Sequence, residues 1–321
     1  MVELWIAFVA LVFVLLALDL GLLNKTPHAP TMREAGSWTV LWVTLGVAFS
    51  GIIWGLYEGG MWGAADPNPK MGGTEAALLY LTAFVLEKSL SIDNLFVMAM
   101  IFGSYRVPVA LQHRVLFWGI LGALVMRAAM ILGGVWLIAR FEWLMYLFGA
   151  YLVWAGVSQL KEESDDGEPP LFARLLSRAV PVDDGLEGGQ FVRRIGGTLH
   201  ATPLLLALVS IEAADVVFAL DSVPAVLTIS TDSFIIFTSN VFAILGLRAL
   251  YFVLADMMDR FGRLKYALAF LLAFIGAKMI LHDFVHIPIG VSLGVVLGSL
   301  VAGVIASIYG PQPSQRDSQA A

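Results

Sequence analysis

The chain contains a succession of apolar stretches, each as long as a membrane-spanning helix. A helix needs roughly 20 apolar residues to cross the hydrocarbon core of a bilayer. We expect about nine such helices, at residues 3–23, 38–57, 76–102, 114–138, 142–160, 203–229, 234–255, 264–284 and 288–309. Because 59% of the residues are hydrophobic and 14% are charged, the chain is too apolar for a water-soluble globule. The sequence predicts an all-α, polytopic membrane helix bundle.

The apolar stretches divide the chain into segments. Residues 1–75 form an N-terminal two-helix segment, 76–160 and 203–287 form two three-helix units, and 288–321 hold the last helix and a tail. Between the two units, residues 161–202 are hydrophilic and rich in acidic residues, Gly and Pro. This composition is typical of a flexible linker, with a regulatory or metal-sensing role as the alternative.

Basic residues gather in alternate loops between the predicted helices. One set of loops carries most of the Lys and Arg, whereas the opposite set offers Lys70 and Arg140. Loops rich in Lys and Arg stay in the cytoplasm. We therefore expect a bacterial inner-membrane protein with its N-terminus outside and its C-terminus in the cytoplasm.

The two three-helix units resemble each other in order along the chain. Asp93 aligns with Asp215, Arg127 with Arg248, and Gly156 with Gly276. An odd number of crossings forces the second unit to enter from the opposite face. We therefore expect an inverted-topology repeat, which builds several transporter folds with an ion site at the repeat interface. Chance similarity between apolar helices is the alternative.

Acidic residues lie deep inside two of the predicted helices. They are Glu87, Asp93, Glu212, Asp215 and Asp221. Each acid near a helix centre costs roughly 2.5–3.5 kcal/mol on insertion scales. These side chains must therefore face a partner, water or a cation.

Helical spacing places most of these polar residues on two faces. Glu87, Ser91 and Asn94 share one face of the helix at 76–102, and Glu212, Asp215, Ala219 and Ser222 share one face of the helix at 203–229. Asp93 and Asp221 lie off these faces. We expect a helix break to bring them in, because Pro224 removes a backbone donor just after Asp221.

Carboxylate, amide and hydroxyl oxygens are the ligands that Mg²⁺, Ca²⁺ and Mn²⁺ prefer. The chain has no cysteine, which excludes thiolate metal sites and cysteine redox chemistry. We expect the cation to be a transported substrate that exchanges for protons, not a tightly bound cofactor. The predicted metal ligands are Glu87, Asp93, Asn94, Glu212, Asp215, Asp221 and Ser222.

Several further residues are weaker candidates for the site. Ser91 and Asn240 offer additional oxygen ligands, and Asp19 either lines an exit or touches lipid headgroups. The basic residues Lys88, Arg127 and Arg248 offset part of the acidic charge. We favour structural ion pairing for Arg127 and Arg248, and we leave open whether Lys88 neutralises Glu87 or Asp93. In the alternative, the acids pair with the bases and only lock the bundle.

Three stretches resemble signatures of the TerC family of integral membrane proteins. They lie at residues 86–97, 214–225 and 238–249, and Glu87-Lys88-Ser89 is also similar to the Alx branch of that family. The resemblance covers the chain from Asp19 to the last predicted helix. It implies Mn²⁺ efflux from the cytoplasm, with tellurium resistance as the older label for the family. It points to Glu87, Asp93, Asn94, Asp215, Asp221 and Ser222.

Our first hypothesis is a secondary transporter that exports a hard divalent cation, Mn²⁺ with Ca²⁺ as the alternative, by proton exchange. The second is a non-transporting membrane scaffold for metal or stress (tellurium) resistance. An intramembrane aspartyl protease is disfavoured, because the chain lacks the Gly-x-Gly-Asp signature. We expect no enzyme activity and no nucleic-acid partner. The expected partners are the metal ion, protons and the lipid bilayer.

Overall fold

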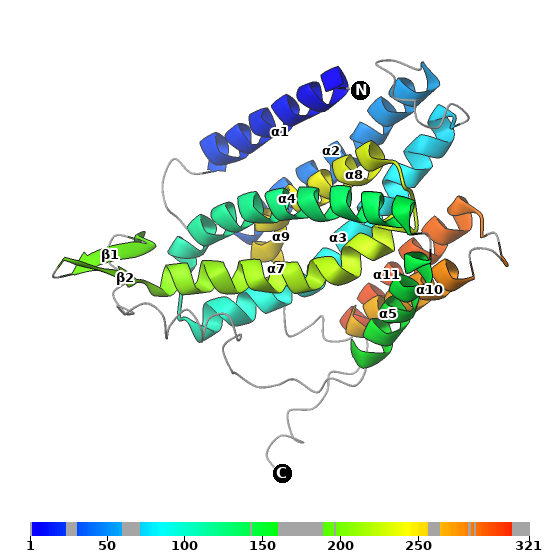
Figure 1. Ribbon diagram of the computed structural model, residues 1–321. Coiled ribbons are helices and arrows are strands. Elements are labelled where there is room, and N and C mark those ends of the chain that lie inside the picture. The colour runs from blue at the N-terminus through cyan, green and yellow to red at the C-terminus, as the bar shows by residue number, and fades with distance from the viewer. Residues whose placement is uncertain are drawn as a thin grey trace, which may run out of the picture.

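A computed structural model describes most of the chain. The described residues are 2–23, 31–59, 71–141, 143–159, 189–195, 197–255, 264–281, 284–285 and 287–309. Within these ranges the structure is built of helices, apart from one short hairpin (Figure 1). The predicted all-α class is confirmed.

The helices follow the predicted apolar stretches closely. They are α1 (Val2–Leu23), α2 (Met32–Glu58), α3 (Gly73–Ser104), α4 (Val109–Arg140), α5 (Leu144–Gln159), α7 (Pro203–Leu227), α8 (Ser233–Ile244), α9 (Leu247–Ala255), α10 (Leu264–Ile280) and α11 (Ile289–Tyr309). Helices suit a bilayer, because each satisfies its backbone hydrogen bonds internally where lipid offers none.

Not every helix is long and apolar enough to count as a membrane span by length and composition. Four described helices are, namely α2, α4, α7 and α11, or five spans if the bent pair α8 and α9 counts as one. α1, α5 and α10 have shorter apolar parts. The centre of α3 carries Glu87, Lys88 and Asp93. Nine crossings therefore stay a prediction.

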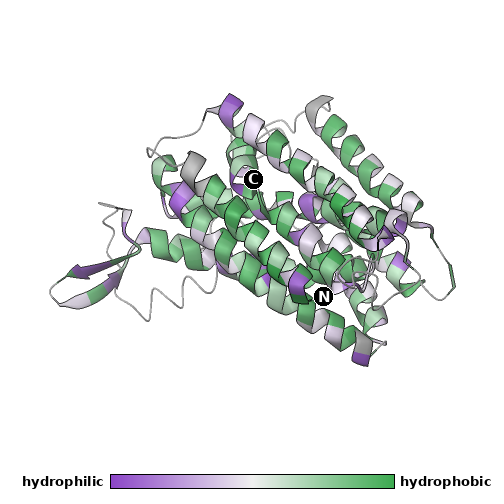
Figure 2. Ribbon diagram, turned by 90° about the horizontal axis from the view of Figure 1, so that it is seen from above, coloured by the Kyte–Doolittle hydropathy of each residue, from purple (hydrophilic) through white to green (hydrophobic). Residues whose placement is uncertain are grey.

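Many helix faces carry exposed apolar side chains. On α4, for example, Val125 is 73% exposed and Trp136 is 65% exposed. Figure 2 shows hydrophobic residues along most helices and hydrophilic ones mainly at helix ends and on the hairpin. Large exposed apolar surfaces of this kind mark contact with lipid or another apolar partner.

The described part of the predicted linker contains an element that the sequence pattern did not predict. β1 (Val192–Ile195) and β2 (Thr198–Ala201) pair as an antiparallel hairpin, with Val192 opposite Ala201. This hairpin projects from the helices and leads directly into α7 (Figure 1). Residues 160–188 lie outside the described part, so the structure does not test the flexible-linker interpretation there.

Four helices, α3, α4, α7 and α8, pack against one another in the centre of the bundle. α2 covers α3 and α8 on one side, and α1 packs its aromatic residues over them. Trp5 and Phe8 of α1 contact Phe234 of α8 with ring centroids 5.4 and 5.7 Å apart. The polar residues of the predicted site lie on α3 and α7, inside this four-helix centre.

The predicted break in α7 is wrong, because the helix continues through Pro224 to Leu227. Pro224 sits in the last turn, so its missing N–H disturbs the end of the helix and not its middle. No break occurs in α3 between Gly73 and Ser104 either. A helix break occurs instead between α8 and α9, whose axes are bent by 43° relative to each other.

Gly246 lies at the break between α8 and α9. Its φ of 82° is a left-handed conformation that favours glycine. A Cβ atom there would lie 2.5 Å from the Cβ of Trp42, so side-chain space is also lacking. The carbonyl oxygens of Ala243 and Leu245, at the end of α8, accept hydrogen bonds of 3.0 and 3.4 Å from Lys88 Nζ. The lysine thus satisfies acceptors that a helix end leaves open.

α5 and α10 cross at very short range through small residues. A Cβ atom on Gly149 would lie 2.9 Å from the carbonyl oxygen of Gly276, and one on Gly276 would lie 2.5 Å from that of Gly149. Gly156 has the same relation to Ala269, at 2.5 Å. Small residues let the backbones of membrane helices approach closely, which strengthens van der Waals packing.

We predict that Gly276→Leu destabilises the protein by separating α5 from α10. Inserting a side chain into a packed contact costs about 1–3 kcal/mol, so the Tm of the purified protein in detergent should fall by several degrees. The matched control is Gly298→Leu on α11, where a Cβ atom meets nothing within 4 Å. Equal Tm values for the two variants would show that the crossing is not tightly packed.

Candidate functional site

Five buried polar side chains meet in the centre of the bundle, and we call them the Arg127 cluster. α3 supplies Glu87 and Asn94, α7 supplies Asp215 and Ser222, and α4 supplies Arg127, each at most 5% exposed. On both α3 and α7 the paired residues are seven positions apart, which is two helical turns and therefore one face. Local helix geometry thus turns Glu87, Asp215 and Ser222 toward Arg127 of α4 and turns Asn94 toward Asp215.

Arg127 joins the three helices by its guanidinium group. It forms ion pairs with Glu87 and with Asp215, where Nη2 lies 3.3 Å from Oδ1. Nη1 donates a hydrogen bond of 3.4 Å to the Ser222 hydroxyl. Asn94 Nδ2 donates to the same Asp215 oxygen at 3.2 Å. Arg127 thus forms two ion pairs in this structure.

The cluster leaves polar atoms without a hydrogen bond. Glu87 Oε2, Asp215 Oδ2 and Arg127 Nε are buried and have no hydrogen-bond partner among the described residues. An unpartnered buried polar atom is unfavourable, so each such atom in a native site requires an explanation. Two open carboxylate oxygens on neighbouring helices are acceptors for a cation or a water molecule.

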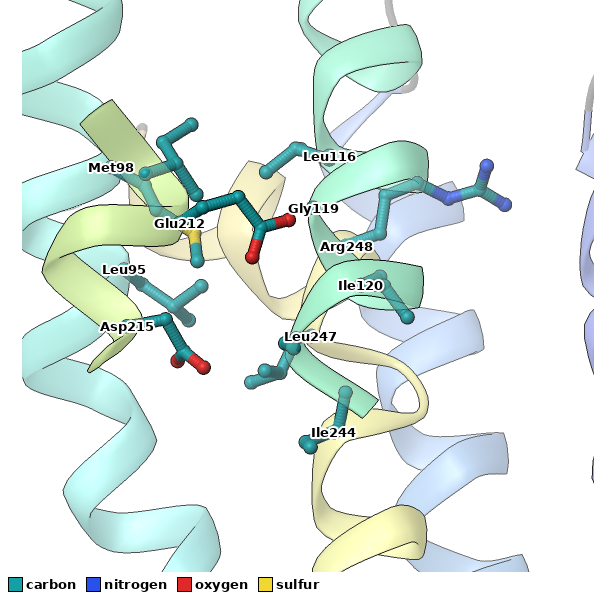
Figure 3. Close-up of a pocket in the computed structure, with 12 residues that line it drawn as sticks. Leu95, Met98, Leu116, Gly119, Ile120, Glu212, Asp215, Ile244, Leu247 and Arg248 are labelled. Carbon is teal, nitrogen blue, oxygen red and sulfur yellow. The ribbon is translucent and has the colours of Figure 1, made fainter. Parts of the chain in front are cut away.

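A pocket opens beside the cluster and shares Asp215 with it. Its lining is mostly apolar and comprises Leu95, Met98, Leu116, Gly119, Ile120, Ala123, Ile211, Glu212, Asp215, Ile244, Leu247 and Arg248. Figure 3 shows the carboxylates of Glu212 and Asp215 directed into this space, whereas the Arg248 side chain extends away from them. The pocket gives the buried Asp215 an apolar surrounding with a second carboxylate one turn away.

Glu212 fits against α4 because position 122 is glycine. A Cβ atom on Gly122 would lie 2.1 Å from Glu212 Oε1. Any larger residue would displace this carboxylate. Sequence reasoning missed Gly122. The only signal in the sequence was a glycine in the middle of a predicted membrane helix, which is common at helix contacts.

Other weaker candidates for the site lie outside the Arg127 cluster. Ser91 donates its hydroxyl to the Glu87 carbonyl at 2.7 Å, so it serves its own helix. Lys88 donates to the end of α8, while Glu87 pairs with Arg127. Asn240 is buried on α8, and its Nδ2 has no hydrogen-bond partner within the described ranges. Arg248 is 4% exposed on α9.

Three predicted acids cannot be placed as ligands. The side chains of Asp19, Asp93 and Asp221 lie outside the described residues, although their backbones belong to α1, α3 and α7. Among the side chains that the structure describes, no three His, Asp or Glu residues are grouped so that they could hold a metal ion. The predicted convergence of all the acids on one cation is therefore not tested.

The chain is similar to a known family of membrane proteins and to several of its members. Residues 72–315 match the model of the integral membrane protein TerC family. The chain is 45% identical over 285 residues to the "Putative membrane-bound redox modulator Alx" of Escherichia coli strain K12, covering 88% of this chain and 86% of that protein. The Salmonella typhi protein of the same description is also 45% identical, with the same coverage.

A relative from another organism is similar over nearly the same length. The "Uncharacterized membrane protein STKORF319" of Myxococcus xanthus is 43% identical over 283 residues, covering 88% of this chain and 84% of that protein. No solved structure matches the chain. The match to the family model and the identity to these relatives establish that this multi-pass membrane protein belongs to the TerC family and is Alx-like.

Proposed function

We propose that this protein is a secondary transporter that exports a hard divalent cation, Mn²⁺, from the cytoplasm in exchange for protons. The observation that carries the proposal is the pair of buried carboxylates, Glu87 and Asp215, with open oxygens in the centre of a membrane helix bundle. Ionisable groups at such depth mark ion pathways and proton relays in membrane proteins. Mn²⁺ as the ion, with Ca²⁺ as the alternative, follows from the family resemblance.

The donor atoms of the cluster favour a hard cation. Glu87 and Asp215 offer carboxylate oxygens, Asn94 an amide oxygen and Ser222 a hydroxyl. Mg²⁺, Ca²⁺ and Mn²⁺ prefer these ligands, whereas softer metals prefer sulfur. Asp93 and Asp221 stand next in sequence to Asn94 and Ser222 and complete the proposed ligand set, with Glu212 in the adjoining pocket.

The inverted repeat is part of the proposal, and the packing supports it. Gly156 and Gly276 are equivalent positions in the predicted repeat. Gly149 and Ala269 have the same sequence offset as that pair, so they are equivalent positions too. Exchanging the two units therefore converts the contact of Gly149 with Gly276 into the contact of Ala269 with Gly156, and both contacts occur. In the same way, the packing of α3 on α8 corresponds to that of α7 on α4.

Such a repeat suits alternating access. Two inverted units give two related conformations, one open to each side of the membrane, around a fixed central site. The Arg127 cluster lies between α3 of the first unit and α7 of the second. With most Lys and Arg in alternate loops, we place the N-terminus outside and the C-terminus in the cytoplasm of a bacterial inner membrane.

The Alx relatives are described as redox modulators, which suggests a redox function as a second candidate. The sequence of this protein argues against that function. The sequence contains no cysteine, so its own side chains provide no thiol for redox exchange. A non-transporting scaffold for metal or tellurium resistance stays the rival. Metal-dependent flux by purified protein in liposomes separates the two, because a scaffold carries no ion across.

We predict that Glu87→Gln and Asp215→Asn each lower Mn²⁺ flux in proteoliposomes by about tenfold or more, because each removes a charged oxygen ligand from the proposed site. Flux is measured with a Mn²⁺-sensitive dye trapped inside the vesicles. The matched control is Glu75→Gln, an exposed acid in the first turn of the same helix α3, which should transport normally. Normal flux by well-folded Asp215→Asn protein would contradict the proposed site.

We also predict that Gly122→Ala weakens Mn²⁺ binding several-fold, because the added methyl group displaces the Glu212 carboxylate. The dissociation constant is measured by isothermal titration of the purified protein. Gly133→Ala is the control, since it lies on the same helix α4 and a Cβ atom there meets nothing within 4 Å. If both variants bind like the wild type, Glu212 does not belong to the site.

A further inference from the structure

A cation already occupies the space between the two carboxylates of the candidate site. The Arg127 guanidinium pairs with Glu87 on α3 and with Asp215 on α7. Arg127 is 2% exposed and is among the largest fully buried side chains of the described residues. A metal ion that bridged Glu87 and Asp215 would need the place that this group now holds.

Electrostatics explains why a cation is required there when no ion is bound. Buried carboxylates are strongly disfavoured in hydrocarbon unless a positive charge lies close by. Arginine suits this task, because its charge is delocalised and it stays protonated in proteins. Arg127 thus keeps an ion-free site stable within the bilayer. With two carboxylates and one guanidinium, the three groups carry a net negative charge when both acids are ionised.

The guanidinium divides its contacts among three side chains and does not form a two-bond pair with one acid. Its contacts to Asp215 and Ser222, at 3.3 and 3.4 Å, are at the long end of the hydrogen-bond range. Nε has no partner among the described residues, and one oxygen of each carboxylate is also open. A fork-shaped pair with one acid would use two parallel hydrogen bonds. Arg127 is therefore shared among Glu87, Asp215 and Ser222, and each carboxylate keeps an oxygen that the guanidinium does not contact.

We infer that Arg127 is a tethered counter-cation that competes with the transported ion for Glu87 and Asp215. The inference rests on the proposed function and adds a mechanism to it. The guanidinium withdraws from the carboxylates when the metal ion binds and returns to them when the ion leaves. Its return prevents two negative charges from trapping the ion in the membrane, so Arg127 weakens binding and speeds release.

The test is the effect of removing this charge on the binding and transport of Mn²⁺. Arg127→Met should bind Mn²⁺ about tenfold more tightly and should show a lower maximal flux in proteoliposomes, because release becomes slow. If Arg127 were purely structural, Arg127→Met would bind Mn²⁺ more weakly, or its Mn²⁺ affinity and its maximal flux would both equal those of the wild type. Isothermal titration and vesicle flux of the full-length protein measure the two quantities.

Two further variants make the experiment decisive. Arg127→Lys keeps a charge but loses the fork that bridges both acids, so its affinity should lie between the wild type and Arg127→Met. It also serves if Arg127→Met does not fold. Lys278→Met removes a half-buried cation that donates to Ser292 at 2.9 Å, far along the chain from the cluster, and should leave Mn²⁺ affinity unchanged.

The outcomes separate this inference from the proposed function. Wild-type protein that neither binds nor transports Mn²⁺ would overturn both. Wild-type protein that binds and transports Mn²⁺, together with Arg127 variants whose affinity is equal or weaker, would overturn the counter-cation role alone. Tighter binding with slower flux in Arg127→Met, and unchanged binding in Lys278→Met, is the result expected.

Discussion

The placement of charge in the centre of an apolar bundle is the constraint on which the rest of this structure depends. Glu87 and Asp215 cannot face lipid, and the guanidinium of Arg127 pairs with both of them where α3, α4 and α7 meet. Buried ion pairs of this kind are strongly destabilised when one partner is removed, by about 3–5 kcal/mol. The pairing therefore fixes which faces of three helices turn inward, and the same side chains are the cation ligands that we propose.

The remaining architecture keeps these helices in position. Close contacts of Gly149 and Gly276 bring α5 and α10 together, while Gly246 lets the chain bend between α8 and α9 against Trp42. Lys88, the neighbour of Glu87 in sequence, binds the carbonyl groups at the end of α8. A single turn of α3 thus contacts both the Arg127 cluster, through Glu87, and the end of α8, through Lys88.

Much of this arrangement could be predicted from the sequence, because it follows from local periodicity. The apolar stretches predicted the positions of the helices. The seven-residue spacing predicted that Glu87 and Asn94 share one helix face and that Asp215 and Ser222 share another. The break at Gly246 and the seat of Glu212 at Gly122 could not be predicted, because each depends on a side chain from another helix. Pro224 was misleading, since a proline in the last turn leaves the helix intact.

The central claim is that one metal ion is held between the carboxylates of α3 and α7. An experimental structure of the protein with Mn²⁺, with anomalous difference maps recorded at the manganese edge, tests this claim most directly. We expect a manganese peak between the carboxylates of Glu87 and Asp215, with the Arg127 guanidinium moved away from Asp215. A saturated sample with Arg127 still bridging both acids and manganese elsewhere would contradict it.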